Sequence, residues 1–190
     1  IILASRSKAR RKLLKGLGFK FTVSASNIKE DHVYKRNLRK LVIKNALAKA
    51  KDAAKNNKTA IIIAADTVVQ TGKKLIGKPK NTDDAITTIR LLSKKPHWVY
   101  SGLAVIDARS GKTFTASEKT KVFMSKLSKK ESEDYCRRYL PLDKAGSFDI
   151  QGPGAMFIER IEGCYYNVVG LPLAKLVKIL KKLQVRLLDS

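Results

Sequence analysis

The feature that most constrains this fold is a run of five consecutive isoleucines and alanines at residues 61–65, closed by the acid Asp66. A short continuous apolar run with polar ends is typical of a strand that is buried on both faces of a helix-covered sheet. Residues 60–70 therefore predict a central strand. Such a strand needs helices on both sides of its sheet, which favours an α/β fold.

The segments around this strand alternate between strand and helix patterns. Strands are expected at residues 1–5, 19–25, 75–77 and 155–161, with a hairpin at 98–106 and 113–124. Helices are expected at residues 8–14, 37–56, 82–93, 129–138 and 171–183. This order predicts a mixed, twisted sheet with flanking helices, drawn out into two lobes around a cleft. With 190 residues and no clean linker, residues 1–190 are expected to form one domain.

The charge of the chain favours anionic partners. Lys and Arg number 40 against 16 Asp and Glu, a net charge of +24, which suits nucleic acid, an acidic surface or phosphorylated small molecules. No apolar run approaches the roughly 20 residues that span a bilayer, so no membrane partner is expected. Two cysteines, Cys136 and Cys164, argue against a disulfide scaffold and a cysteine-built zinc site. Without a secretory leader, the expected location is cytoplasmic.

Two clusters combine polar groups with a strand end. Ser7 and Arg10 lie where the first strand passes into a helix, so hydroxyl, guanidinium and backbone N–H groups can meet a polyphosphate there. Capping of the helix by Ser7 explains the pattern equally well. Asp66-Thr67 follows the buried strand, where a carboxylate can hold Mg²⁺ or accept a proton, and Glu30 offers a second acidic ligand. The alternative is an Asp that caps a turn.

Two glycine-containing segments add cations. Residues 72–79 follow the spacing of a P-loop until Pro79 replaces the Ser or Thr that binds Mg²⁺, which excludes that motif. Lys78, between Gly77 and this proline, remains a candidate phosphate contact or one more surface lysine. Residues 143–154 hold three glycines beside Lys144 and Gln151, a cation and an amide that can contact a ligand. A purely structural loop is the alternative.

Taken together and in this order, the clusters resemble the Maf family of nucleoside triphosphate pyrophosphatases. The resemblance covers essentially the whole chain and is carried by Leu3-Ala4-Ser5, Gly77-Lys78-Pro79, and residues 64–69, 143–146, 150–152, 159–163 and 167–172. It implies the fold shared by Maf proteins and inosine triphosphatases. It also implies cleavage between the α and β phosphates of a nucleoside triphosphate, with Mg²⁺ or Mn²⁺ as cofactor.

The resemblance also implies roles for individual residues. Asp66 matches the proton acceptor, and Glu30 with Asp66 matches the metal ligands. Positions associated with substrate binding are Ser7, Arg10, Lys49, Thr67, Lys78, Lys144 and Gln151. Of all these residues, Lys49 alone is not marked by the residue patterns themselves.

Substrate choice within the family follows from two positions. Asp66-Thr67 and Ile150-Gln151-Gly152 resemble the branch that acts on dTTP and UTP, whereas the 7-methyl-GTP branch has Gln after the Asp and Glu in place of Gln151. A neutral amide can both donate to and accept from the edge of thymine or uracil, which favours a pyrimidine substrate. The chain departs from the family at Ala9, where an Arg is usual, and at Ala48, where a Glu is usual. Both departures lie next to expected phosphate-binding residues.

A second function class is a basic nucleic-acid-binding or regulatory protein without catalysis. The positive charge would then contact a nucleic acid, with affinity that falls steeply as salt rises. The cations are scattered along the chain, and no aromatic-rich RNA motif or DNA-reading helix accompanies them. We therefore expect a nucleoside triphosphate partner and no specific nucleic acid. The sequence leaves open whether the chain forms a homodimer.

Overall fold

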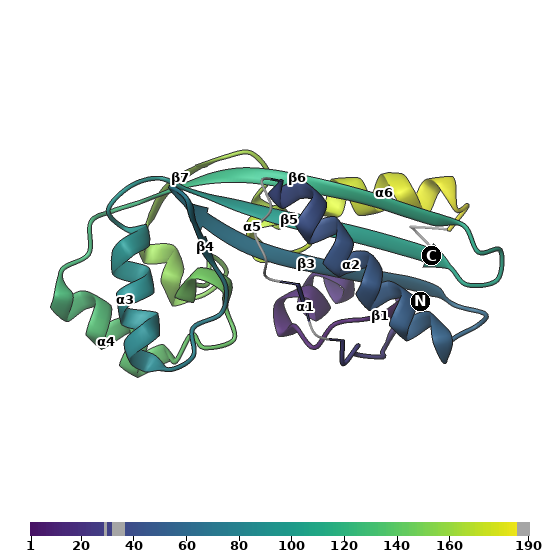
Figure 1. Ribbon diagram of the computed structural model, residues 1–190, viewed down its shortest axis with the longest axis horizontal. Coiled ribbons are helices and arrows are strands. Elements are labelled where there is room, and N and C mark those ends of the chain that lie inside the picture. The colour runs from purple at the N-terminus through teal and green to yellow at the C-terminus, as the bar shows by residue number, and fades with distance from the viewer. Residues whose placement is uncertain (29, 32–36, 186–190) are drawn as a thin grey trace. The chain divides into compact units, whose positions relative to one another are not determined.

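A computed structural model describes residues 1–28, 30–31 and 37–185, and within them seven strands form one mixed sheet (Figure 1). The strand order is β2-β1-β3-β5-β6-β7, with β4 pairing with β3. The strands are β1 (Ile2–Leu3), β2 (Thr22–Val23), β3 (Ile61–Thr71), β4 (Lys74–Ile76), β5 (His97–Asp107), β6 (Thr113–Met124) and β7 (Ile158–Glu162). The predicted mixed sheet with flanking helices is confirmed.

Most helices begin at a polar capping residue. The helices are α1 (Lys8–Gly16), α2 (Leu38–Lys55), α3 (Thr82–Leu92), α4 (Lys129–Tyr139), α5 (Tyr165–Val169) and α6 (Leu173–Lys182), with 3₁₀ turns at Ala145–Ser147 and Pro153–Phe157. The side chains that cap α1 to α4 are, in order, Ser7, Asn37, Asn81 and Ser128. Each accepts a backbone N–H from the first turn, which satisfies a donor that has no partner inside the helix.

The chain divides into two compact units. Unit 1 contains the described parts of Ile1–Asp66, Ser101–Glu118 and Gly170–Ser190, and unit 2 contains Thr67–Tyr100 and Lys119–Val169. Strands β3, β5 and β6 contribute residues to both units. The predicted division into two lobes agrees with these two units, each of which has its own core.

Close packing of α2 against the sheet defines the core of unit 1. Strand β1 lies between β2 and β3 and runs parallel to both. Alanines on α2 pack against small and branched residues of the sheet; the buried members are Ala46, Ala50, Ala53, Ile62, Ala64, Ala104 and Ile106. A Cβ atom on Gly102 would lie 2.1 Å from the carbonyl oxygen of Val42, so only glycine permits this approach. The contact holds α2 against β5 and thereby orients the side chains of α2 that face the sheet.

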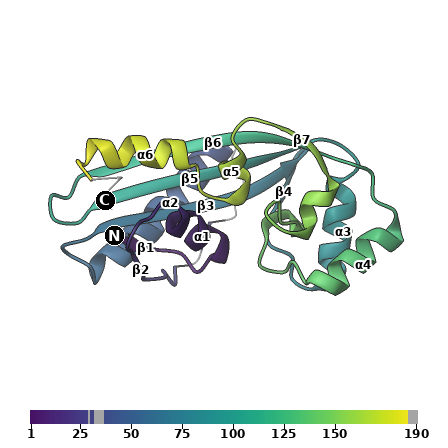
Figure 2. The ribbon, with the colours of Figure 1, turned by 180° about the vertical axis from the view of Figure 1, so that it is seen from behind.

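Unit 2 is built around α3, α4 and the neighbouring strands (Figure 2). Its buried cluster includes Val69, Ile89, Leu92, Val99, Val122, Phe148 and Phe157. Asn167 on α5 joins this unit together, because its Nδ2 donates to the carbonyl oxygen of Val99 at 3.0 Å and to Oγ1 of Thr120 at 2.8 Å. A buried amide that bonds two strands stabilises their register.

Four predicted boundaries were clearly wrong. The strand expected at residues 1–5 pairs only at Ile2–Leu3. The strand expected at residues 155–161 is β7 (Ile158–Glu162), because Pro153–Phe157 forms a 3₁₀ helix in which Gly154 packs against the backbone of Asp149. The strand expected at 19–25 pairs only at Thr22–Val23, because its partner β1 offers only two residues. The last helix starts at Leu173 and not at residue 171, because Pro172 is its cap.

In the part of the chain that the structure describes, no helix combines the length and apolar character needed to cross a bilayer. Cys136 and Cys164 are both free thiols.

Candidate active site

Asp66 on β3 is the centre of a buried polar cluster in unit 1. Its Oδ1 accepts from Nζ of Lys49 at 2.8 Å, and its Oδ2 accepts from Nδ2 of Asn45 at 3.0 Å. Lys49 and Asn45 are four residues apart on α2, so they lie one turn apart on the same helix face. Both oxygens of Asp66 are therefore oriented by one helix, and each keeps a lone pair for a further partner.

Lys49 bridges two carboxylates. Its Nζ lies 2.7 Å from Oε1 of Glu30 and 2.8 Å from Oδ1 of Asp66. The side chains of Lys49 and Asp66 are 12% and 4% exposed, whereas that of Glu30 is 38% exposed. Buried charges are tolerated only when they are paired and hydrogen-bonded. The cluster therefore presents one buried acid, one more accessible acid and a shared cation.

Asn45 also holds the chain segment that carries Glu30. Its Oδ1 accepts from the backbone N–H of Asp31 at 3.0 Å, and its Nδ2 donates to the carbonyl oxygen of Asp31 at 2.9 Å. Reasoning from the sequence missed Asn45. The available signal was an asparagine four residues before Lys49, on the face of α2 that is otherwise apolar.

The first strand–helix turn places Arg10 within the electrostatic influence of these acids. Ser7 caps α1, because its Oγ accepts from the backbone N–H of Arg10 at 3.3 Å. The Arg10 side chain donates from Nε to the carbonyl oxygen of Gly170 at 2.8 Å and from one terminal nitrogen to Oγ of Ser5 at 3.1 Å. Burial lowers the pKa of Arg10 from its ordinary value, and the carboxylates of Asp66 and Glu30 oppose this shift. The capping role of Ser7 is confirmed, while its contact with phosphate stays a prediction.

The other predicted cations lie on two segments of unit 2 that a backbone bond joins. The N–H of Gly146 donates to the carbonyl oxygen of Gly77 at 3.0 Å, next to the exposed Lys78. Gly146 has a φ of 79°, and a Cβ there would lie 3.0 Å from Leu92. Lys144 forms an ion pair with Asp143 at 2.6 Å and lies 3.9 Å from Asp149. This unit therefore brings the segments of Lys78 and Lys144 together through glycine backbone.

Gln151 and Thr67 complete the predicted set in unit 2. The backbone N–H of Gln151 donates to Oδ1 of Asp149 at 2.9 Å, which fixes the turn that carries its side chain. Thr67 is half-buried and directly follows Asp66 in β3. Successive residues of a strand project to opposite faces, so Thr67 is not expected to share the α2 side of the sheet with Asp66.

The donors around Asp66 bear on the predicted metal. Among the residues that the structure describes, no three or more His, Cys, Asp or Glu side chains gather into a metal-binding group. Glu30 and Asp66 supply two carboxylates. Mg²⁺ commonly binds through one or two carboxylates and completes its shell with water and substrate phosphates. The residues present therefore fit a divalent ion that shares its ligands with a phosphate group.

Comparison with known proteins identifies the family. Residues 1–183 match the family model Maf, described as Maf-like protein. A dTTP/UTP pyrophosphatase from Methanosarcina barkeri is 43% identical over 191 residues, covering 100% of this chain and 97% of the relative. Proteins of the same name from Dictyoglomus thermophilum and Clostridium botulinum are 43% and 44% identical and cover 99% and 96% of this chain, with 98% of each relative aligned. The arrangement of Asp66, Lys49 and Arg10 therefore lies in a chain that belongs to the Maf family.

Proposed function

We propose that this protein is a nucleoside triphosphate pyrophosphatase that prefers dTTP and UTP. The observation that carries the proposal is the buried Asp66 carboxylate, held by Lys49 and Asn45 and accompanied by the second acid Glu30. A fixed carboxylate beside partly buried cations suits a reaction in which water is deprotonated and phosphate charge is neutralised. The three relatives described above, each named dTTP/UTP pyrophosphatase, support the same reaction and substrates.

In the proposed reaction, water attacks the α-phosphorus and Asp66 accepts its proton. A bond forms between the water oxygen and the α-phosphorus, while the bond from that phosphorus to the bridging oxygen breaks. The electron pair of the broken bond leaves with pyrophosphate, and the nucleoside monophosphate is the second product. Asp66 has the acceptor capacity for this step, because Asn45 donates to one of its oxygens and Lys49 to the other, and each oxygen has two lone pairs.

Several cations are assigned to the phosphates. Lys49 contacts Asp66 in unit 1, and Arg10 of the same unit interacts electrostatically with Asp66; both would offset the charge that grows on the leaving group. Lys78 and Lys144 in unit 2 are assigned to the phosphates from the family resemblance, together with Ser7. Lys144 is suited to this role because its side chain, although paired with Asp143, is 25% exposed and can reach a phosphate.

Glu30 and Asp66 would hold the divalent ion, Mg²⁺ or Mn²⁺. When bound, such an ion supplies Lewis-acid neutralisation of phosphate oxygens. Glu30 is the more accessible of the two acids, which suits a ligand that exchanges with substrate. The free thiols Cys136 and Cys164 suit a reducing compartment, and we place the enzyme in the cytoplasm.

Base choice is assigned to Gln151, with Thr67 as a second contact. The Gln151 amide has a donor and an acceptor, the pair that the edge of uracil or thymine requires. The hydrogen bond from the Gln151 backbone to Asp149 supports a fixed position for the residue that carries this amide.

The test is a panel of canonical and modified nucleoside triphosphates, assayed separately for pyrophosphate and orthophosphate with Mg²⁺ and with Mn²⁺. We expect pyrophosphate release that is fastest with dTTP and UTP. Orthophosphate as the first product would mean that a different bond is cleaved and would overturn the proposal.

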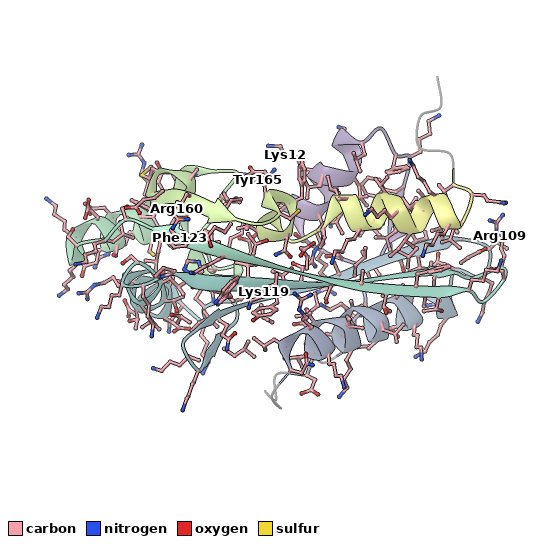
Figure 3. All side chains as sticks on the ribbon, turned by 90° about the horizontal axis from the view of Figure 1, so that it is seen from above. Lys12, Arg109, Lys119, Phe123, Arg160 and Tyr165 are labelled. Atoms are coloured by element: carbon pink, nitrogen blue, oxygen red, sulfur yellow. The ribbon has the colours of Figure 1, made fainter. Side chains whose placement is uncertain are left out.

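The nucleic-acid-binding alternative has one candidate surface in unit 2. Lys119 Nζ lies 3.6 Å from the centre of the Trp98 ring. The Arg160 guanidinium lies 3.5 Å from the centre of the Phe123 ring, and Figure 3 shows these two side chains close together. These cations cover ring faces on which bases would stack, so the surface favours intramolecular stabilisation over base stacking. A salt-titrated binding assay that found tight single-strand binding would favour the alternative.

A further inference from the structure

We propose that Asn45 is a positioning residue, which fixes Asp66 and the segment of Glu30 and Asp31 in one relative arrangement. The inference rests on the proposed pyrophosphatase function. Asn45 is 3% exposed and lies on α2, with its amide between β3 and this segment. Three hydrogen bonds of 2.9–3.0 Å connect it to both.

The pattern of these bonds uses the whole donor capacity of an asparagine. One Nδ2 hydrogen serves the carbonyl oxygen of Asp31 and the other serves Oδ2 of Asp66, while Oδ1 accepts the N–H of Asp31. A reversed amide would place its oxygen against two acceptors and its nitrogen against a donor. The network therefore dictates the amide orientation. Neither aspartate nor leucine reproduces this combination of two donors and one acceptor.

The two residues of α2 have separate tasks. Lys49 compensates the charges of Glu30 and Asp66 through its ammonium group. An ammonium on a long flexible stem can follow a carboxylate that moves, so Lys49 alone does not fix their separation. Asn45 bonds the backbone beside Glu30 in both directions, which does fix that segment against α2. The separation of the two proposed metal ligands is therefore set by Asn45.

This role matters because both carboxylates must meet the same substrate. Glu30 is the more exposed acid and is held by its ion pair with Lys49 and by the anchor on Asp31. If the hydrogen bonds between Asn45 and the backbone of Asp31 are lost, a smaller fraction of molecules has both carboxylates in position. We expect kcat to fall while KM for the nucleotide stays nearly constant, since the hydrogen bonds of Asn45 go to Asp31 and Asp66 and its role is to position the carboxylates.

The test compares N45A and N45D with the wild type in the full chain. N45A should lower kcat about 10- to 100-fold, the range typical of residues that orient metal ligands, with KM for dTTP changed less than about threefold. Backbone hydrogen exchange measured by NMR gives a readout that is independent of activity. The Asp31 amide should exchange at least about tenfold faster in N45A, because its acceptor is gone.

N45D separates the two halves of the network. Its carboxylate still accepts the N–H of Asp31, so the protection of that amide should largely remain. It cannot donate to Asp66 and opposes it with like charge, so kcat should fall at least as far as in N45A. If N45A does not fold, kcat and Asp31 amide exchange in N45D still test whether Asn45 positions Asp66.

The matched control is N57A. Asn57 is a second amide that bonds α2, since its Nδ2 donates to the carbonyl oxygen of Ala53 at 2.7 Å and to Oγ of Ser24 at 3.4 Å. These bonds go to Ala53 and Ser24 and not to Asp66 or Asp31, so N57A should lower thermal stability without lowering kcat. An equal fall of kcat in N57A, wild-type kcat in N45A or N45D, or unchanged Asp31 exchange in N45A would overturn the inference. If the wild type releases no pyrophosphate, the proposed function fails, while the exchange comparison still shows whether Asn45 holds the segment.

Discussion

The two units position polar side chains in different ways. In unit 1, Asp66 is buried and is held by side chains of one helix, Asn45 and Lys49. In unit 2, Lys144 lies on a partly exposed loop whose path depends on the backbone of Gly146 and on Asp149. The first arrangement should fail when a side-chain functional group is removed. The Lys144 loop of unit 2 should instead be disrupted when its backbone is crowded, because glycine backbone determines much of its path.

The largest effect is expected from Asp66→Asn. An amide cannot accept the proton of the attacking water, so kcat should fall by about 10² to 10⁴-fold. The variant should remain folded, since Lys49 keeps its ion pair with Glu30. Steady-state kinetics with dTTP, combined with far-UV circular dichroism, measures both.

The control for this change is Asp52→Asn, which also removes a carboxylate from unit 1. Asp52 accepts from Ser26 at 2.9 Å and from Lys55 at 3.3 Å. Its loss should leave kcat within about twofold of the wild type. Full turnover in Asp66→Asn would remove Asp66 from the mechanism and with it the contrast between the units.

Acid should weaken unit 2 through His97. Burial lowers the pKa of this histidine to about 4, against a smaller raising effect from the backbone of Leu92. Between pH 6.5 and about 4, His97 is protonated in the unfolded chain but stays neutral in the folded chain. The free energy of unfolding therefore decreases as pH falls through this range. The expected loss from this residue is about 3 kcal/mol across that window.

Urea unfolding at several pH values measures this loss. His97→Phe keeps an aromatic ring against Phe148 and removes the titrating group, so its stability should fall less between pH 6.5 and 4. The other histidine, His32, is present in both proteins and cancels in the comparison. Parallel stability curves for the two proteins would contradict the assignment.

Backbone crowding in unit 2 is tested by Gly146→Ala. Its φ of 79° strains any other residue, and the added Cβ would lie 3.0–3.2 Å from Leu92, Phe148 and Val69. We expect a loss of about 1–3 kcal/mol in unfolding free energy. Calorimetry or denaturant unfolding measures it.

Gly111→Ala is the matched control, because Gly111 has a φ of 71° and nothing within 4 Å of its Cβ position. The two variants share the backbone strain and differ in crowding. Equal losses would show that packing around Gly146 does not contribute to the stability of unit 2.

The smallest effect is expected from Gln151→Glu. A carboxylate loses the amide donor and repels phosphate charge, so kcat/KM for dTTP and UTP should fall about tenfold more than for purine triphosphates. Competition assays between UTP and GTP measure this ratio. An equal fall for every triphosphate would assign Gln151 to the phosphates or to the loop, and the pyrimidine assignment would lose its basis.

The elements of the fold were largely predictable, because apolar patterns mark buried strands and helices directly. Residues 61–65 predicted β3, but the expectation that the strand ends at Asp66 was wrong, because β3 continues to Thr71 with Val68 and Val69 buried. The strand expected at 155–161 was misplaced, because alternating patterns cannot reveal that Gly154 packs against Asp149 and bends the chain into a 3₁₀ turn.

The site was less predictable than the fold. Lys49 is one of six Lys or Arg residues in α2, and nothing local distinguishes it; it was found only through the family resemblance. Asn45 was missed, because a polar residue on an apolar helix face becomes informative only when its partners, Asp31 and Asp66, are known to meet there. Contacts between residues distant in sequence decide which polar groups are buried.

In the proposed reaction, water attacks the α-phosphorus of the nucleotide and not the β- or γ-phosphorus. Hydrolysis of dTTP in water enriched in oxygen-18, followed by mass spectrometry of the products, tests this point most directly. We expect one labelled oxygen in dTMP and none in the pyrophosphate. Label in the pyrophosphate would show attack at the β-phosphorus, and labelled orthophosphate would show cleavage of another bond; either result would rule out attack at the α-phosphorus.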